Sequence, residues 1–162
     1  MRILGIDCGS QITGYGIIDS EGRTHQAVAY GAIRVPRGRE LAERLRIVAD
    51  GLEEVLDRFH PAEAAVEDVF QRGNARNAVV LAHVRGAALV CLARAGLPVA
   101  SYAPKQVKSS VVGHGSADKR QVQQMVQVLL GLGEAVESLD ASDALAVAYC
   151  HANRRDAHLR GG

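Results

Sequence analysis

Four carboxylates of this chain interrupt apolar segments, and their type and placement could support chemistry. Asp7 ends the first apolar run, Glu67 follows three consecutive apolar residues, and Asp140 and Asp143 open the last apolar segment. An acid in such a position is costly to bury without a partner. Because carboxylates that meet in a dry crevice repel one another, the usual relief near neutral pH is a bound hard cation.

The chemistry that these acids predict is hydrolysis of a phosphodiester bond. Oxygen ligands without a histidine or cysteine set disfavour zinc and favour Mg²⁺, which binds a few carboxylates together with water and phosphate oxygens. Mn²⁺ is the expected substitute. With two ions in one site, one activates a water as the nucleophile and the other steadies the leaving oxygen.

Each acid also has a structural explanation. Asp140 could be the N-cap of a helix with Asp143 at the third helical position, where both would complement the helix dipole. Asp7 could begin a turn. Glu67 is harder to explain in this way, because it follows apolar strand residues. The neighbouring Asp68 should point to the opposite face of its strand, so we leave it out of the site.

Apolar periodicity and turn residues indicate the elements that must position these acids. Strands are predicted at residues 3–7, 14–19, 26–35, 64–70 and 97–102, and helices at 40–59, 74–95, 117–130 and 139–153, with a further helix beginning near Pro104. The order excludes an all-parallel sheet. It predicts an α/β fold with a mixed five-stranded sheet and helices on both faces.

Two placements would bring the acids together. If the first and fourth strands are neighbours, Asp7 and Glu67 face each other in the crevice at the sheet edge. Asp140 and Asp143 are three residues apart on one helix, so they project from one side and can reach the same point.

Length and composition predict one domain in a reducing compartment. A chain of 162 residues, 48% of them hydrophobic, buries one core, so residues 1–153 should form a single domain with a flexible basic tail at 154–162. Three cysteines without a C-x-x-C spacing suggest neither a disulfide framework nor a zinc knuckle. With no signal peptide and no run of about 18 apolar residues, we expect a cytoplasmic protein without a membrane span.

The net charge of +1 is unevenly distributed along the chain. No carboxylate lies between Asp68 and Asp118, whereas this stretch carries several cations: Arg72, Arg76, Arg85, Arg94, Lys105 and Lys108. A basic middle third predicts one face that attracts a polyanion. Alternatively, some of these arginines extend from a buried helix to reach water.

The helix predicted at 74–95 is apolar on most of its circumference. A helix on the surface of a monomer usually carries polar residues on its outer face. We therefore expect this helix either to lie centrally in the core or to pack against another subunit.

A series of short motifs resembles the RuvC-type Holliday-junction resolvases of the RNase H-like superfamily, in order from about residue 1 to residue 152. The matching segments are residues 5–10, 13–16, 67–70, 106–108, 111–113, 117–119 and 140–146. The last of them, Asp-x-x-Asp-Ala-Leu within Asp140–Ala146, is the most specific. The family's acidic tetrad falls on Asp7, Glu67, Asp140 and Asp143, the same residues that placement alone singled out.

The resemblance implies a crossover junction endodeoxyribonuclease with an RNase H-like fold that acts in homologous recombination and DNA repair. It implies a homodimer, Mg²⁺ and paired symmetric nicks across a four-way DNA junction, together with RuvA and RuvB as partners. Two copies packed through the helix at 74–95 would hold two active sites in the relation that the two symmetric strands require.

The resemblance also indicates candidate DNA contacts. Phe70 follows the catalytic glutamate and could stack on an unpaired base, or it could be a core residue. Lys108 and Lys119 could contact phosphate near the scissile bond, or they could be solvated helix charges. Arg72 and Arg76 are weaker candidates for contacts to the DNA backbone.

Three residues depart from the family pattern: Cys8 stands where relatives often have proline, Asp68 adds an acid beside the catalytic one, and His114 lies in the glycine-rich loop at 113–116. Their roles stay open, although ordinary loop chemistry is expected for His114. None of them removes a member of the tetrad.

Two other classes compete with a nuclease. The segment 5–10 also resembles the first phosphate loop of actin-like and sugar-kinase ATPases, but 162 residues do not accommodate the second domain that these proteins need. A relative that binds nucleic acid without cutting it would be marked by a lost carboxylate, and none is lost here.

Overall fold

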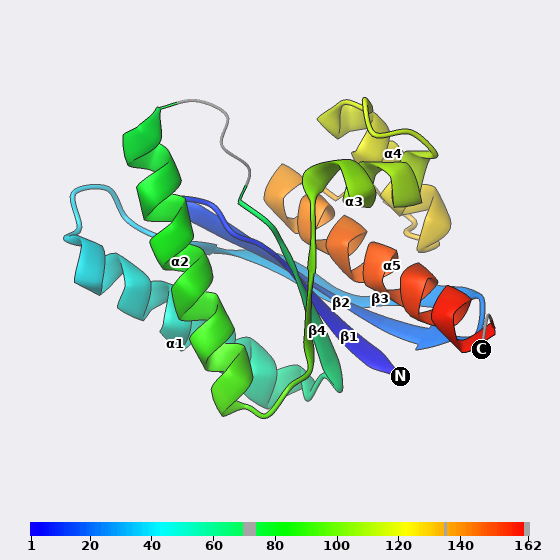
Figure 1. Cartoon of the computed structure of the whole chain (residues 1–162), viewed down its shortest axis with the longest axis horizontal. Helices are drawn as coiled ribbons and strands as arrows, with labels where there is room; N and C mark the ends of the chain where they lie inside the picture. Colours follow the sequence, from blue (N-terminus) through cyan, green and yellow to red (C-terminus); the bar gives the residue numbers. More distant parts are fainter. Residues whose placement is uncertain (70–73, 135, 161–162) are drawn as a thin grey trace.

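The structure is a computed structural model that describes residues 1–69, 74–134 and 136–160, the last five of them by backbone alone. Its elements follow in the order β1 (Arg2–Asp7), β2 (Ile12–Glu21), β3 (Thr24–Arg34), α1 (Leu41–Phe59), β4 (Glu63–Glu67), α2 (Ala75–Arg94), β5 (Val99–Tyr102), α3 (Pro104–Val112), α4 (Lys119–Leu129) and α5 (Leu139–Arg160) (Figure 1).

The strands form one mixed five-stranded sheet in the order β3-β2-β1-β4-β5, as the sequence predicts. The first three strands pair antiparallel, whereas β4 is parallel to both β1 and β5. Because β1 and β4 are parallel neighbours with Ile6 opposite Val66, both strands end at the same edge. The residues that end them are Asp7 and Glu67.

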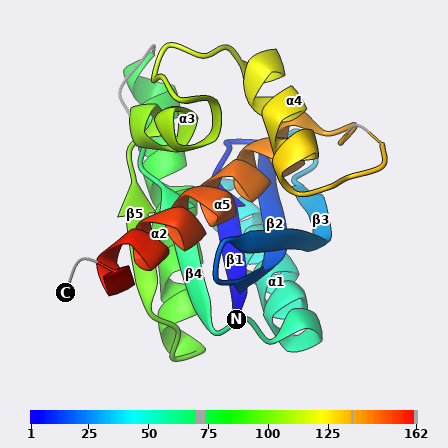
Figure 2. The same cartoon turned by 90° about the vertical axis from the view of Figure 1, so that its right-hand side faces the viewer.

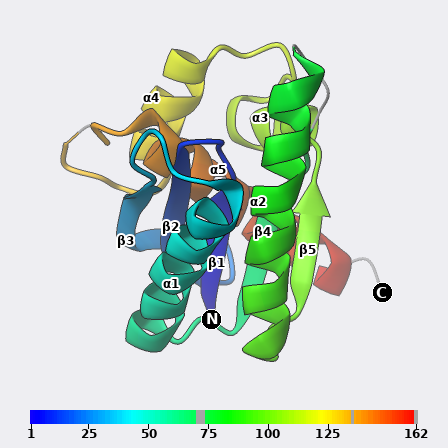
Figure 3. The same cartoon turned by 90° about the vertical axis from the view of Figure 1, so that its left-hand side faces the viewer.

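Helices cover both faces of this sheet. Figure 1 shows α1 and α2 on one side and α3, α4 and α5 on the other. In Figure 2 α5 crosses in front of the sheet, and in Figure 3 α1 and α2 lie side by side in front of the opposite face. Side chains that alternate along β1 supply both cores: Ile3 packs with residues of α5, whereas Leu4 and Ile6 pack with residues of α1 and α2.

Glycines let α5 approach the sheet closely. A Cβ added to Gly5 would lie 2.1 Å from the Ala144 carbonyl oxygen, and one added to Gly14 would lie 2.0 Å from the Asp140 carbonyl oxygen. A side chain at either position would push the helix away. The start of α5 is therefore held directly against the ends of β1 and β2.

Helix α2 lies on the surface of this chain, so the first of its two predicted alternatives, a central position in the core, is wrong. It buries Val84, Ala88, Cys91 and Leu92, whereas Val79 and Val90 are more than half exposed. Within the described residues it is the one helix whose length and composition would suffice to cross a membrane. Its buried face packs against α1 and the sheet.

Some element boundaries differ from those predicted. Helix α4 begins at Lys119 and not at residue 117, because the Asp118 side chain caps it by accepting a hydrogen bond from the Gln121 N–H. Helix α5 continues to Arg160, seven residues past the predicted end at 153. Strand β4 ends at Glu67 and not at residue 70.

Candidate active site

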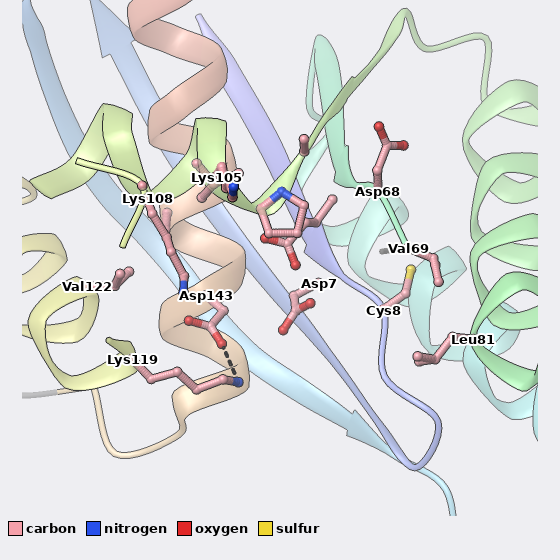
Figure 4. A pocket seen from close by; sticks show the side chains of 16 residues that line it. Asp7, Cys8, Asp68, Val69, Leu81, Lys105, Lys108, Lys119, Val122 and Asp143 are labelled. Carbon is pink, nitrogen blue, oxygen red and sulfur yellow. Dashed lines mark hydrogen bonds and ion pairs between the residues drawn. The ribbon is translucent and has the colours of Figure 1, made fainter. Parts of the chain in front are cut away.

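Three of the four carboxylates line one cavity of about 580 Å³ at the sheet edge where β1 and β4 end. Asp7 comes from β1, Glu67 from β4 and Asp143 from the second turn of α5. Figure 4 shows Asp7 and Asp143 projecting into the same space. Residues far apart in the sequence thus meet in one cavity, as the sequence predicts.

Strand periodicity explains why Asp7 and Glu67 point the same way. Ile3 and Ala65 belong to the core beneath α5, and side chains at even spacings from them lie on the same face. Asp68, one position further, is directed to the opposite face and forms an ion pair with Arg85 of α2 at 2.7 Å. Asp68 nevertheless lines the same cavity, with its carboxylate paired to Arg85.

The start of α5 excludes the capping explanation for Asp140. The Ser138 hydroxyl accepts a hydrogen bond from the Ala141 N–H at 3.3 Å, so Ser138 is the cap and Asp140 lies inside the first turn. Asp140 is not among the described residues that line the cavity. Its charge is nevertheless close enough to raise the pKa of both Asp7 and Asp143.

Burial and mutual repulsion make these acids hard to ionise. Burial raises the pKa of Asp7 to about 7, with a further contribution from the Asp143 carboxylate. It raises the pKa of Glu67 to about 8, helped by Asp7 and Asp143. The pKa of Asp143 is also raised by burial, although the hydrogen bond from Lys119 opposes this shift. The cavity therefore stabilises added positive charge.

Lysines supply part of that positive charge. The Lys119 ammonium donates a hydrogen bond to the Asp143 carboxylate at 2.9 Å, drawn as a dashed line in Figure 4. Burial lowers the Lys119 pKa, but this hydrogen bond and the neighbouring acids raise it by more. Lys108 lines the same cavity and lowers the pKa of Glu67 and Asp143. Both lysines thus lie beside the acids.

Lys105 is a cavity residue that sequence reasoning missed. It lies one turn before Lys108 on α3, and both line the cavity. The signal was available, because two lysines three residues apart on a helix that begins at Pro104 share a face.

The donor set fits a hard divalent cation. Within the part of the chain that the structure describes, no group of three or more histidine, cysteine, aspartate or glutamate side chains is placed so that it could hold a metal ion. The cavity instead offers the oxygens of Asp7, Glu67 and Asp143, with the Lys119 ammonium as a partial counter-charge. This suits Mg²⁺, which binds one or two carboxylates and keeps water or phosphate oxygens as its other ligands.

Cys8 lines the cavity but its chemistry differs from that of the acids. Burial, with the charge of Asp7, raises the pKa of its thiol to about 12, so the thiolate is not available near neutral pH. Its side chain packs with the core on the α2 side of the sheet. In Figure 4 it points toward Val69 and Leu81, away from Asp143.

The structure describes only some of the other predicted residues. Phe70 and Arg72 lie outside the described residues. Arg76 is exposed in the first turn of α2 and does not line the cavity. His114 pairs with the Ser116 hydroxyl at 3.0 Å, which is the ordinary loop role expected for it.

Comparisons with known proteins agree with this geometry. The family model described as crossover junction endodeoxyribonuclease RuvC matches residues 3–151. The RuvC of Halorhodospira halophila is 51% identical over 158 residues, covering 98% of this chain and 93% of that protein. The RuvC of Geobacter sulfurreducens is 53% identical over 153 residues, covering 94% and 93%.

Solved structures show the same relationship. T. thermophilus RuvC in complex with a Holliday junction substrate superimposes with a TM-score of 0.90 at 33% identity, covering 98% of this chain and 96% of that one. The RNase H-like fold expected from the sequence is thereby confirmed. From its sequence and its structure alike, the chain belongs to the RuvC family of crossover junction endodeoxyribonucleases.

Proposed function

We propose that this protein resolves four-way DNA junctions by paired symmetric nicks in homologous recombination and DNA repair, through metal-assisted hydrolysis with water as the nucleophile. One observation carries the proposal: Asp7, Glu67 and Asp143 line a single cavity that lysines flank. It is supported by similarity to RuvC proteins over nearly the whole chain.

Asp7, Glu67 and Asp143 would hold Mg²⁺, or Mn²⁺ in its place, with Asp140 as the fourth member of the tetrad. When bound with DNA, two such ions supply an activated water and stabilise the leaving oxygen. Asp7 and Glu67 must first release the protons that their raised pKa values retain, because a carboxylate binds a cation only when ionised.

The lysines act on the phosphate. Lys108 and Lys119 lie beside the acids and can bind the non-bridging oxygens of the scissile phosphate, where their charge also offsets the negative charge that develops during attack. Phe70, Arg72 and Arg76 would contact DNA. They would contribute affinity and register but no chemistry.

Two active sites must act on one junction, which favours a homodimer through α2. The exposed Val79 and Val90 on that helix support this arrangement. RuvA and RuvB are the partners, and the cytoplasm the location, that the family resemblance implies.

The decisive experiment compares a labelled four-way junction with linear duplex DNA, with Mg²⁺ or with EDTA. We expect symmetric nicks on the junction alone and only with the metal ion. The variant Asp7→Asn should abolish cutting and leave junction binding nearly intact, since it removes a metal ligand and no cation. The matched control is Asp57→Asn, an exposed acid on α1.

Two outcomes would contradict the proposal. Cutting by Asp7→Asn at the wild-type rate would remove the acids from the chemistry. Equal cutting of linear duplex would leave a nuclease without specificity for junctions.

A further inference from the structure

Arg85 of α2 connects three oxygens beside the catalytic strand end. Its guanidinium donates hydrogen bonds to the Asp68 carboxylate at 2.7 Å and to the Ser101 hydroxyl at 2.6 Å. Its Nε donates to the Glu67 carbonyl oxygen at 3.3 Å. The Arg85 side chain is 20% exposed and that of Asp68 is 44% exposed, so the ion pair is partly buried.

These contacts lie at the end of β4, where its backbone hydrogen bonds to β5 end. The last backbone hydrogen bond between β4 and β5 in this region runs from the Asp68 N–H to the Tyr102 carbonyl at 2.9 Å. Glu67 is the final residue of its strand, and its carboxylate must project into the cavity. Arg85 binds the backbone carbonyl of Glu67. It also binds the side chain of Asp68, which follows β4, and that of Ser101 on β5.

A guanidinium suits this position better than an ammonium would. Its donors are fixed in a planar fork, so one side chain can hold three oxygens in set directions. It also neutralises Asp68, whose charge lies one residue from Glu67. Asp68, the extra acid of this sequence, lines the cavity beside Glu67, and its ion pair with Arg85 gives it a structural role there.

We propose that Arg85 is a positioning residue, which fixes the end of β4 from α2 so that the Glu67 carboxylate is held in its cleavage geometry. The inference rests on the proposed function. It gives α2 a second role, since the helix proposed to join two subunits also holds a catalytic strand. Small displacements of a catalytic group have large kinetic effects, because the reacting atoms must stay aligned.

The test uses Arg85→Met, Arg85→Lys and Ser101→Ala in the full chain, with Arg46→Met as the control. Arg46 forms an exposed ion pair with Asp50 on α1, on the same side of the sheet but away from the cavity. Cleavage of a labelled junction gives kcat and KM, and junction binding is measured in EDTA. Hydrogen exchange at the Asp68 amide reports the order of the strand end without reference to activity.

We expect Arg85→Met to lower kcat by about 10- to 100-fold with KM and junction affinity nearly unchanged. Its Asp68 amide should exchange faster. Arg85→Lys should recover part of the kcat and part of the slow amide exchange, because a lysine keeps the positive charge but not the planar fork of donors. Ser101→Ala should lower kcat by less than Arg85→Met does. Arg46→Met should match the wild type in both measurements.

Unchanged kcat and unchanged exchange in Arg85→Met would overturn the inference. So would a loss confined to KM or to junction affinity, which would make Arg85 a DNA contact. If Arg85→Met does not fold, Arg85→Lys and Ser101→Ala decide by the same measurements. A wild-type chain that does not cut junctions would defeat the proposed function alone, since the exchange measurement still tests the positioning.

Discussion

Asp7 is buried at the end of a strand next to Asp143, and this environment couples proton release to metal binding. In the absence of a divalent ion the group retains a proton up to about pH 7. An entering cation must displace that proton, so apparent metal affinity should rise with pH. The same coupling makes the empty site a source of instability at neutral pH.

Replacing Asp7 with asparagine should stabilise the metal-free protein at high pH. The folded chain holds the Asp7 proton up to about pH 7, whereas the unfolded chain releases it near the ordinary value of 3.8. Wild-type stability therefore falls as pH rises from about 4 to 7, and Asp7→Asn avoids this loss. We expect its advantage in urea unfolding to be small at pH 4 and about 2 kcal/mol at pH 8.

Asp57→Asn is the control. Because Asp57 is exposed on α1, the difference in unfolding free energy between this variant and the wild type should not increase with pH. An Asp7→Asn advantage of equal size at pH 4 and pH 8 would mean that Asp7 is not protonated in the folded site. Unfolding is followed in EDTA so that no divalent ion supplies the missing charge.

Replacing Lys119 with methionine should move the pH dependence of cleavage upward. Lys119 lowers the pKa of Asp7, Glu67 and Asp143, and these acids must be ionised to bind the metal ion. Without the ammonium, the midpoint of the rise in kcat/KM with pH should increase by about one unit. Arg120 is the next residue along the chain and is exposed, so Arg120→Met should leave the midpoint of the pH profile unchanged. If kcat/KM falls by the same factor at every pH and the midpoint does not shift, Lys119 contributes only to DNA binding.

At the scale of elements, the site depends on how closely α5 packs on the sheet. Positions such as Asp7 and Glu67 could be predicted from sequence, because strand alternation and a parallel neighbour fix which side each acid faces. The depth at which Asp143 enters the cavity could not. It depends on glycines of β1 and β2 that meet the α5 backbone, and this contact is long-range.

Other features also needed the structure to decide them. The helix at 74–95 was expected in the core as one alternative, because its composition does not reveal which residues α1 and the sheet cover. Asp140 was open to explanation as a helix cap until Ser138 was found to fill that position. Lys105 was missed although it shares a face of α3 with Lys108, because only the structure shows that this face borders the cavity.

The packing of α5 gives a direct prediction for Gly5→Ala. The added Cβ would lie 2.1 Å from the Ala144 carbonyl oxygen and 2.6 Å from the Ala148 nitrogen, both of them backbone atoms that cannot rotate away. We expect a loss of about 3 kcal/mol in the free energy of unfolding, together with lower kcat as α5 shifts Asp143. Gly133→Ala is the control, since a Cβ there meets nothing within 4 Å. Wild-type stability in Gly5→Ala would show that the helix and sheet can separate freely.

At the scale of the whole molecule, α2 presents an apolar face that no described part of this chain covers. Val79 is 56% exposed and Val90 is 57% exposed. Gly86 lies between them on the same face, and a Cβ there would meet nothing within 4 Å. A stripe with a small residue at its centre lets a second backbone approach, and two copies of α2 related by a two-fold axis would cover each other's stripes. Figure 3 shows that this helix lies on the outside of the sheet layer.

Introducing a charge on this stripe should separate the subunits and uncouple the two nicks. Val90→Glu would place two carboxylates near the symmetry axis of the proposed dimer, where burial of each is costly. We expect sedimentation to show monomers at concentrations where the wild type is dimeric, and junctions to receive single nicks that do not resolve them.

Val128→Glu is the control: Val128 is 72% exposed, but it lies on α4, across the sheet from α2. A Val90→Glu protein that remains dimeric and cuts both strands would place the subunit contact on a different surface. The charges of Lys105, Lys108 and Lys119 should still hold DNA in the monomer, so junction binding weakens less than resolution does.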